Sequence, residues 1–329
     1  MPYVVTLTLN PAIDKSTSVP QLVPDQKLQC APPTVEPGGG GINVARGLQR
    51  LGLQARAVFV AGGPPGEVLQ QLMAREGLAA HPVPTAAWTR ENLTVVDAST
   101  NQQYRFGMPG TTVTAAEQAQ VLAALDALAP LPDVLVVSGS LPQGVAPAFM
   151  GDVARWARQA GARLIVDTSG EALRSAVAEG VYLLKPNLGE LARLAGVPAL
   201  DSASAAAAAQ ALIAQGRCEI VVVSLGPVGA CLVTREVVEH IAAPAVKKQS
   251  TVGAGDSMVA GLVFALSQGR PVREAVRLGV ACGTAATMNP GTELFHAADA
   301  EKLFQWLLQT MPAAVPAGPG VEIQAVVPK

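Results

Sequence analysis

The chain has 329 residues, 25 acidic and 23 basic side chains, a formal net charge of -2, and only 15% charged residues. A typical soluble domain carries about 25% charged residues, so this chain lacks the basic excess with which proteins neutralise nucleic-acid phosphates. Half of its residues are hydrophobic, which is enough apolar surface to offset the entropy lost on folding, so a mainly disordered chain is also excluded.

The cysteines and the uncharged runs indicate a cytoplasmic protein without a membrane segment. The first ten residues lack the positive region of a secretory signal. The uncharged run 134–151 is broken by turn residues, which argues against a membrane span. No CxxC pair occurs, which argues against a disulfide framework or a zinc site. The four cysteines are Cys30, Cys218, Cys231 and Cys282.

Short aliphatic runs alternate with helix-length segments along most of the chain. Runs that are apolar on both faces are typical of a parallel sheet covered by helices, so the pattern predicts a doubly wound α/β fold. The predicted strands are Tyr3–Leu9, Ala55–Ala61, Val134–Val137, Arg163–Val166, Val181–Leu184 and Ile220–Ser224. The predicted helices are Ile42–Leu51, Val68–Glu76, Ala115–Leu128, Pro147–Gln159, Leu188–Ala195, Ala203–Gln215, Ala254–Ser267, Val272–Thr287 and Ala298–Thr310.

Two segments interrupt this alternation. Ser16–Val35 and Glu91–Phe106 alternate without a helical period, and they predict a small separate β-sheet that covers the main domain as a lid. The predicted organisation is one α/β domain over residues 1–311, with a discontinuous lid at about 14–35 and 88–107. Residues 312–329 are rich in Pro, Ala and Gly and predict a mobile tail.

The segment Ser250–Ser257, with the sequence STVGAGDS, leads directly into an apolar helix. Its two glycines let the backbone turn closely, so the free amides at the start of the helix predict an anion site. A carboxylate at Asp256 would be placed to take a proton from a hydroxyl that attacks a bound phosphate. The alternative is a plain turn in which Asp256 caps the helix.

A second glycine-rich segment, Glu36–Arg46, also opens a helix. Four consecutive glycines are costly in conformational entropy, which favours close approach of a ligand or another backbone segment. The amide of Asn43 would then lie in the first helical turn, where it can bind sugar hydroxyls. The alternative is a flexible connector.

The segment Lys185–Glu190 follows a predicted strand. Asn187 and Glu190 share a face at a helix start, and together they can position a hydrated Mg²⁺. The same spacing is also typical of a helix cap. Neither a P-loop nor a dinucleotide-binding GxGxxG motif occurs in the sequence.

With these segments taken together, the sequence from Thr6 to about Thr310 resembles the PfkB family of carbohydrate kinases within the ribokinase-like superfamily. Six motifs occur in the family's order. They are TLNPAID ending at Asp14, GGGGINVARGLQRLG at 38–52, VSGSLPQGV at 137–145, KPNLGEL at 185–191, VVVSLGPVGA at 221–230 and STVGAGDSMVAG at 250–261.

The resemblance implies ATP-dependent phosphorylation of the C1 hydroxyl of fructose 6-phosphate to fructose 1,6-bisphosphate. The segments EPGGGGINVAR, WTRENL and QYRFGMPG look most like family members with that activity. Kinases of fructose 1-phosphate or tagatose 6-phosphate, the alternatives, usually have GGKG where this chain has Gly39-Gly40. A non-catalytic sugar-phosphate sensor is a further alternative, because a fold does not fix a function.

The resemblance also implies roles for residues of the catalytic and sugar sites. Asp256 would be the general base, and the amides of Gly253, Ala254 and Gly255 would form the anion hole. Arg90 and Arg105, both in the predicted lid, would clamp the 6-phosphate. The residues implied at the sugar hydroxyls are Asp14, Gly39, Asn43 and Ser140.

Further residues are implied at the nucleotide and the cations. Mg²⁺ would be held through water by Glu190 and Asn187, and a monovalent cation such as K⁺ would bind beside the anion hole. Lys248 stands where close relatives have a small polar residue. The implied partners are a sugar phosphate, ATP and a second copy bound through the lid, with no nucleic acid and no membrane. The implied ATP-site residues are Lys185, Asn187, Ser224, Gly226, Gly229, Val280 and Thr284. The implied monovalent-cation residues are Ser250, Val252, Ala286, Asn289 and Gly291.

Overall fold

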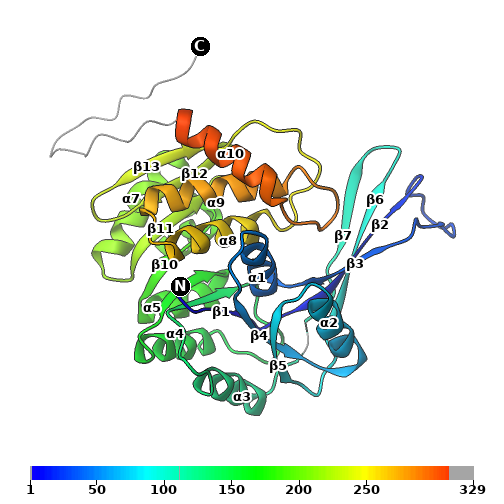
Figure 1. Cartoon of the computed structure of the whole chain (residues 1–329), viewed down its shortest axis with the longest axis horizontal. Helices are drawn as coiled ribbons and strands as arrows, with labels where there is room; N and C mark the ends of the chain where they lie inside the picture. The colour runs from blue at the N-terminus through cyan, green and yellow to red at the C-terminus, as the bar shows by residue number, and fades with distance from the viewer. Residues whose placement is uncertain (1, 111, 311–329) are drawn as a thin grey trace.

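The computed structural model describes residues 2–110 and 112–310 (Figure 1). The predicted tail, 312–329, lies outside the described residues.

The larger of two sheets has nine strands in the order β13-β12-β11-β10-β9-β8-β1-β4-β5. All neighbours from β11 to β5 are parallel, whereas β12 and β13 pair antiparallel at one edge. A mostly parallel sheet was the prediction, and it is confirmed. The strands are β1 (Val4–Thr8), β4 (Arg56–Ala61), β5 (Ala79–Pro84), β8 (Val134–Ser138), β9 (Arg163–Asp167), β10 (Val181–Leu184), β11 (Cys218–Ser224), β12 (Gly229–Val233) and β13 (Val238–Ala242).

Two layers of helices cover this sheet, as Figure 1 shows. Neighbouring strand residues point to opposite faces, so Val134 and Val136 enter one hydrophobic cluster while Leu135 and Val137 enter the other. The first cluster packs against α1 (Gly40–Arg50), α2 (Gly63–Arg75), α8 (Ala254–Ser267), α9 (Val272–Ala286) and α10 (Ala297–Thr310). The second packs against α3 (Ala115–Asp126), α4 (Phe149–Gln159), α5 (Gly170–Glu179), α6 (Leu188–Ala195) and α7 (Ser202–Ala214).

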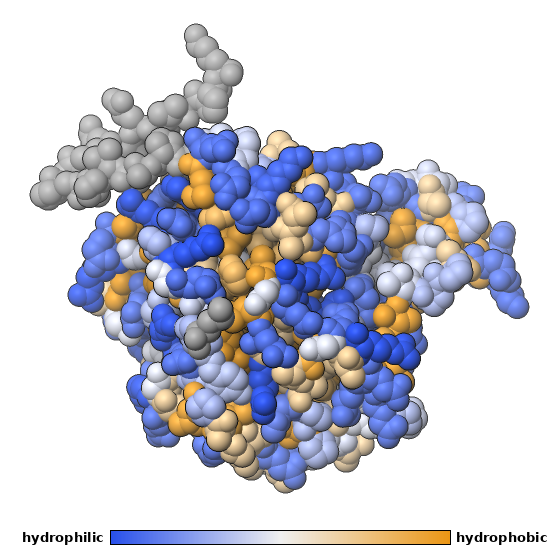
Figure 2. All heavy atoms as spheres, viewed as in Figure 1, coloured by the Kyte–Doolittle hydropathy of each residue, from blue (hydrophilic) through white to orange (hydrophobic). Residues whose placement is uncertain are grey.

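The second sheet has four strands in the order β3-β2-β6-β7 and projects to one side of the main body (Figure 1). Its strands overlap the two segments predicted to form the lid, although β2 begins before the first segment and β3 ends beyond it. We call this sheet the lid. In Figure 2 the projecting lid carries apolar residues among hydrophilic ones. Its strands are β2 (Ala12–Val19), β3 (Thr34–Gly38), β6 (Arg90–Asp97) and β7 (Gln102–Phe106).

Among the described residues, five elements were not predicted by the sequence pattern: β5, β12, β13, α5 and the short 3-10 helix Gly226–Val228. The sequence of β5, AAHPVP, contains two prolines, which cannot donate to a sheet ladder and are tolerated at an edge. β13 is the opposite edge, and most of its residues are exposed or half-buried. Neither edge strand therefore shows the aliphatic run by which the buried strands are recognised.

Cys30 is exposed, and the other three cysteines are buried as free thiols. Among the described residues, none of the helices combines the length and the apolar character needed to cross a bilayer.

Candidate active site

Polar side chains gather at the carboxyl edge of the parallel strands. Asn10 follows β1, Ser138 ends β8, Asp167 ends β9 and Lys185 follows β10. The order of the strands brings these ends together, and the crevice outside the carboxyl ends of an open α/β sheet is where ligands bind. Asp256, in the first turn of α8, reaches the same place.

Asp256 is half-buried, and its carboxyl has polar partners on both oxygens. Asn43 donates to its Oδ2 at 2.9 Å, and the Ser138 hydroxyl donates to its Oδ1 at 3.2 Å. Burial raises the pKa of Asp256 to about 7, with a further contribution from the nearby carboxylate of Asp167. Asn43, Ser138 and Lys185 act in the opposite direction. A carboxyl poised near neutral pH is suited to accept a proton and to release it again.

The first turn of α8 presents backbone amides beside this carboxyl. The helix has no side-chain cap, and its first backbone bond runs from the Ser257 N–H to the Gly253 carbonyl at 2.8 Å. Gly253 is left-handed, with a φ of 72°. The earlier amides of an α-helix have no acceptor within the helix, so this helix start is suited to an anion, and binding of one there stays a prediction.

The glycine run ahead of α1 makes close contacts on both sides. A Cβ on Gly38 would lie 2.0 Å from the Asp14 carboxylate, and one on Gly40 would lie 2.4 Å from the Ser138 hydroxyl. Gly39, the N-cap of α1, has a φ of 107°, which side chains rarely tolerate. The run is therefore an element of close approach and not a flexible connector.

The residues predicted at the sugar lie around the start of the lid. Asp14, on β2, accepts a hydrogen bond from Asn92 of β6 at 2.9 Å, and burial raises the pKa of its carboxyl. Arg90, the first residue of β6, donates to the backbone carbonyl of Asn10 at 3.0 Å. The side chain of Asn10 in turn donates to Ser140 at 2.9 Å. The structure thus links Asp14 with Asn92, and Arg90 with Ser140 through Asn10.

Arg105 contacts a different part of the site. Its guanidinium donates to the hydroxyl of Thr251 at 2.9 Å, and Gln103 of the same strand donates to Ser250 at 3.5 Å. Lid strand β7 thus touches the loop that carries Gly253 to Asp256. Arg90 and Arg105 have separate partners in this structure, and their joint clamp on one phosphate stays a prediction.

A cavity of about 600 Å³ adjoins the amides of Ala254 and Gly255. It contains most of the residues predicted at the nucleotide, and its walls are largely apolar. Lys248 is the one charged residue among those that line it. The predicted residues that line it are Asn187, Ser224, Gly226, Gly229, Val280 and Thr284.

Lys185 does not line this cavity but pairs with Asp167 at 3.1 Å. Its ammonium lies 3.6 Å from the position of a Cβ on Gly255. Burial by itself lowers the pKa of Lys185, but the carboxylates of Asp167, Asp256 and Glu190 outweigh burial and raise it. Three carboxyls therefore surround one ammonium, which leaves the cluster with an excess of negative charge when all are ionised.

Asn187 and Glu190 form a reciprocal helix cap. Asn187 Oδ1 accepts the Glu190 N–H, and Glu190 Oε2 accepts the Asn187 N–H, both at 2.9 Å. Asn187 Oδ1 and Glu190 Oε2 are therefore used in capping the helix, as the alternative interpretation predicted. This cap leaves Oε1 of Glu190 without a hydrogen bond among the described residues, so an oxygen donor is available for a hydrated cation.

The residues predicted at a monovalent cation come from two loops that meet. The Ser250 hydroxyl donates to the carbonyl of Gly291 at 2.7 Å, and its backbone N–H donates to the carbonyl of Thr287 at 3.3 Å. The side-chain amide of Asn289 donates to the Leu294 carbonyl at 2.7 Å. In the described part of the chain, no cluster of three His, Cys, Asp or Glu side chains is suited to hold a metal ion.

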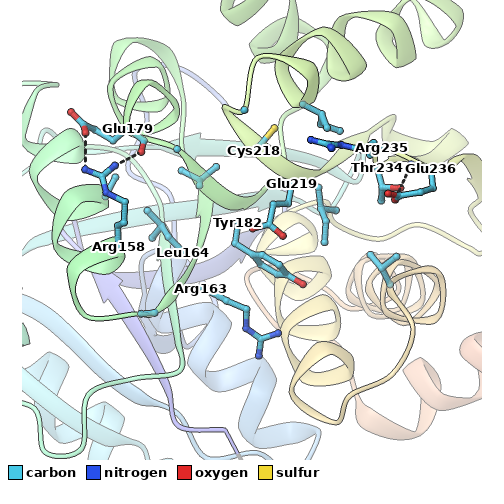
Figure 3. Close-up of a pocket in the computed structure, with 18 residues that line it drawn as sticks. Arg158, Arg163, Leu164, Glu179, Tyr182, Cys218, Glu219, Thr234, Arg235 and Glu236 are labelled. Atoms are coloured by element: carbon cyan, nitrogen blue, oxygen red, sulfur yellow. Dashed lines mark hydrogen bonds and ion pairs between the residues drawn. The ribbon is translucent and has the colours of Figure 1, made fainter.

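A larger cavity, of about 890 Å³, lies at the opposite, amino edge of β9 to β11 (Figure 3). Two of the arginines that line it, Arg158 and Arg163, already have partners. Arg158 donates to the Glu179 carbonyl at 2.6 Å, and the guanidinium of Arg163 lies 5.3 Å from the ring centre of Tyr182. None of the residues predicted to be functional lines this cavity.

The sequence model of the pfkB family carbohydrate kinases matches residues 4–297. The chain belongs to this family. It is 43% identical over 312 residues to ATP-dependent 6-phosphofructokinase isozyme 2 of Escherichia coli strain K12, which covers 93% of this chain and 99% of that relative. It is 38% identical over 269 residues to a 1-phosphofructokinase of Xanthomonas campestris pv. campestris, covering 80% of this chain and 83% of that relative.

Solved structures of Escherichia coli phosphofructokinase-2 have the same fold as this pfkB-family chain. The complex with potassium gives a TM-score of 0.89 at 43% identity, and the complex with fructose-6-phosphate gives 0.87 at 41% identity. Each comparison covers 93% of this chain and 99% of the other. A ribokinase of Thermotoga maritima gives a TM-score of 0.72 at 21% identity, covering 93% of this chain and 100% of that one, which confirms the ribokinase-like architecture.

Four residues of the site were missed by sequence reasoning: Asn10, Ser138, Asp167 and Asn92. Ser138 and Asp167 each end a buried strand, and a polar residue at that position is a signal that the sequence offers. Asn92 gives no such signal, because only the pairing of β2 with β6 brings it opposite Asp14.

Proposed function

We propose that this chain is an ATP-dependent kinase that phosphorylates the C1 hydroxyl of fructose 6-phosphate, giving fructose 1,6-bisphosphate and ADP. The observation that carries the proposal is the position of the Asp256 carboxyl in the first turn of α8, hydrogen-bonded to Asn43 and Ser138 and with a pKa raised to about 7. The names of the 43% identical relatives support the same reaction.

Asp256 acts as the general base. Its carboxylate takes the proton of the C1 hydroxyl as the hydroxyl oxygen attacks the γ-phosphorus of ATP, and the bond from that phosphorus to the ADP oxygen breaks. The amides of Gly253, Ala254 and Gly255 stabilise negative charge on the phosphoryl group in transit. Asn43 fixes the orientation of the base by donating to its Oδ2.

The sugar lies between the start of the lid and the carboxyl edge of the sheet. Asp14, Gly39, Asn43 and Ser140 face its hydroxyls, and a guanidinium from the lid binds its 6-phosphate, for which a planar donor fork is well matched. Contact of the lid with the 250–251 loop supports closure over the reacting groups, which excludes water.

The apolar cavity beside Ala254 takes the adenine and ribose of ATP, and Lys185 faces the phosphates. The negative cluster around Lys185 fits a nucleotide that arrives with Mg²⁺, which Glu190 and Asn187 would hold through water. Bound Mg²⁺ would neutralise phosphate charge during transfer. The two loops that meet at Ser250 and Gly291 supply backbone carbonyls suited to K⁺. The residues predicted for the monovalent cation would hold it.

We also propose one α/β domain over residues 1–311, with the lid at about 14–35 and 88–107, and a homodimer that pairs two lids. Four large apolar side chains on or beside the lid are exposed, and covering them favours an interface between two lids. They are Trp88, Tyr104, Phe106 and Met108.

A second candidate substrate is fructose 1-phosphate, because a 38% identical relative is a 1-phosphofructokinase. Gly40 argues against it. A Cβ at position 40 would lie 2.4 Å from the Ser138 hydroxyl and 2.6 Å from the Gly139 nitrogen. This chain thus packs the start of α1 more closely against β8 than a side chain at position 40 permits.

The deciding experiment is a comparison of kcat/KM for fructose 6-phosphate, fructose 1-phosphate and tagatose 6-phosphate with Mg-ATP. We expect fructose 6-phosphate to be preferred by about tenfold or more, the discrimination that one well-placed phosphate contact supplies. Preference for either other sugar would refute the substrate. Binding of a sugar phosphate without turnover would favour the sensor alternative.

A further inference from the structure

Arg46 of α1 is a buried cation that no step of the proposed mechanism uses. Its side chain is 3% exposed, and a buried charge is tolerated only when it is paired and fully hydrogen-bonded. All five of its N–H groups have acceptors. Nε and Nη2 donate to Glu76, Nη2 also donates to Glu36, and Nη1 donates to the Pro37 carbonyl and to Asn43 Oδ1.

Glu36 connects this cation to the sugar side of the site. It lies on lid strand β3 directly opposite Asp14 of β2, and the charge of Glu36 contributes to the raised pKa of Asp14. Like charges in that register are unfavourable unless one is neutralised. Arg46 neutralises Glu36 at 2.7 Å and keeps the pKa of Glu36 below its usual value, even though burial acts to raise it.

The second oxygen of Glu36 reaches the loop between α9 and α10, residues 287–296. The Thr292 hydroxyl donates to Glu36 Oε2 at 2.6 Å, one residue after Gly291, whose carbonyl holds Ser250. Glu36 thus ties together the lid, α1 and the loop that borders the candidate cation site.

On its other side Arg46 reaches the Asp256 carboxyl through one side chain. Asn43 Oδ1 faces Arg46 Nη1 at 3.5 Å, and Asn43 Nδ2 donates to Asp256 Oδ2 at 2.9 Å. An amide can rotate to exchange its oxygen and nitrogen, and a cation facing the oxygen favours the orientation in which the nitrogen faces Asp256.

We propose that Arg46 and Glu36 are positioning residues that hold the lid strand β3, the Asn43 amide and the α9–α10 loop in register with the Asp256 carboxyl. Arg46 binds both the Glu36 side chain and the Pro37 carbonyl. These residues directly precede Gly38, against which the Asp14 carboxylate packs. A shift of β3 therefore moves the floor of the sugar site. This inference rests on the proposed function.

The two carboxylates that hold Arg46 provide a matched pair of variants. Glu36→Gln and Glu76→Gln each keep the shape of the side chain, remove one negative charge and leave Arg46 with one carboxylate. Glu36 leads to the lid and the α9–α10 loop and is 12% exposed, whereas Glu76 caps the end of α2 and is 34% exposed. A purely structural role of Arg46 gives both variants the same phenotype.

The experiment measures kcat, KM for fructose 6-phosphate and thermal unfolding of both variants and the unmodified enzyme. We expect Glu36→Gln to raise KM and lower kcat, with kcat/KM reduced by about 10- to 100-fold, the loss that a misplacement of about 1 Å can cause. Glu76→Gln should stay within about twofold in both constants while it lowers the unfolding temperature. Thr292→Val, which removes only the hydroxyl, should share part of the Glu36→Gln loss.

Equal kinetic constants for Glu36→Gln and Glu76→Gln, whether both unchanged or both impaired, would overturn the inference. Arg46→Lys provides a further check, because an ammonium cannot serve both carboxylates, the Pro37 carbonyl and Asn43 at once. It should reproduce the Glu36→Gln defect. Failure of the proposed function is distinguishable, because the unmodified enzyme would then not turn over fructose 6-phosphate at all.

Discussion

The two edges of the central sheet differ in how their charges are balanced. At the amino edge, the larger of these two cavities is lined by Arg158 and Arg163, which already contact Glu179 and Tyr182 (Figure 3). At the carboxyl edge, the smaller cavity adjoins the first turn of α8, which has no side-chain cap and carries Asp256, whose carboxyl has a raised pKa. Volume alone would favour the amino edge, whereas the perturbed carboxyl favours the carboxyl edge, where we propose the chemistry.

The direction of the chain explains this difference. Helices α4 and α5 end at the amino edge, where their carbonyl ends favour basic side chains such as Arg158. Helices α1, α6 and α8 begin at the carboxyl edge, where their amide ends favour phosphate. The crossover helices of a parallel sheet have this orientation, whereas α8 follows the antiparallel edge strand β13 and is not a crossover helix.

The largest effect is expected from Asp256→Asn. The amide can accept from Asn43 and donate to Ser138, so the variant should fold while kcat falls by about 10²- to 10⁴-fold, the usual contribution of a general base. Activity is measured with saturating fructose 6-phosphate and Mg-ATP. Near-normal turnover of a folded Asp256→Asn variant would rule out the proposed base.

The same variant should also gain stability. The folded chain holds the Asp256 pKa at about 7, whereas an unfolded Asp has a pKa of about 3.9. The protonated carboxyl therefore contributes stability that is complete below pH ~4 and is lost as pH rises through about 7. Because Asn does not ionise, Asp256→Asn should be more stable than the unmodified chain above pH 7, by about 2 to 4 kcal/mol at most. Thermal unfolding at pH 5 and pH 8 measures this, with the difference shrinking at the lower pH.

A smaller effect is expected from the lid arginines. Arg90→Ala and Arg105→Ala should each raise KM for fructose 6-phosphate by about 10- to 100-fold, since a hydrogen bond to a charged group contributes about 1.5–3 kcal/mol. KM for ATP serves as the internal reference. An unchanged KM for fructose 6-phosphate in both variants would contradict the proposed role of the two arginines in binding the 6-phosphate.

Lys248 should give an effect on the nucleotide alone. It is the one charged residue that lines the apolar cavity, whereas its neighbour Lys247 does not line it. We expect Lys248→Met to raise KM for ATP by about two- to tenfold through loss of one partly screened charge contact, with sugar KM unaffected. Lys247→Met is the matched control, and an equal change in both variants would assign the effect to net charge.

The smallest effect is expected at the amino edge. Arg163→Gln removes a cation that stacks on Tyr182, which should cost about 0.5–1 kcal/mol of stability and leave all kinetic constants within about twofold. A larger kinetic change would show that the two edges are coupled and would break the contrast between them.

The fold was predictable where one physical pattern dominates. Buried strands such as Val134–Ser138 show as aliphatic runs, and glycine-rich turns mark the starts of α1 and α8. The edge strands β5 and β13 were not predictable in this way, because they are half-exposed and one contains prolines.

The candidate site was predictable as a set of motifs but not as a network. Asp256 and its glycines are contiguous in sequence, so their chemistry could be inferred locally. The roles of Asn92 and Arg46 depend on strand pairing and on contacts across the fold, which no local pattern in one sequence encodes. Glu190 could be interpreted as a helix cap or as a cation partner, and its two oxygens leave room for both.

The pH dependence of kcat/KM for fructose 6-phosphate tests most directly the central claim that the Asp256 carboxyl is the base. The acid limb of that profile reports the essential base of the free enzyme. With a pKa of about 7 for Asp256, kcat/KM should fall tenfold per pH unit below about pH 7. A profile that stays flat down to about pH 5, where only an ordinary carboxylate would still be ionised, would contradict the account.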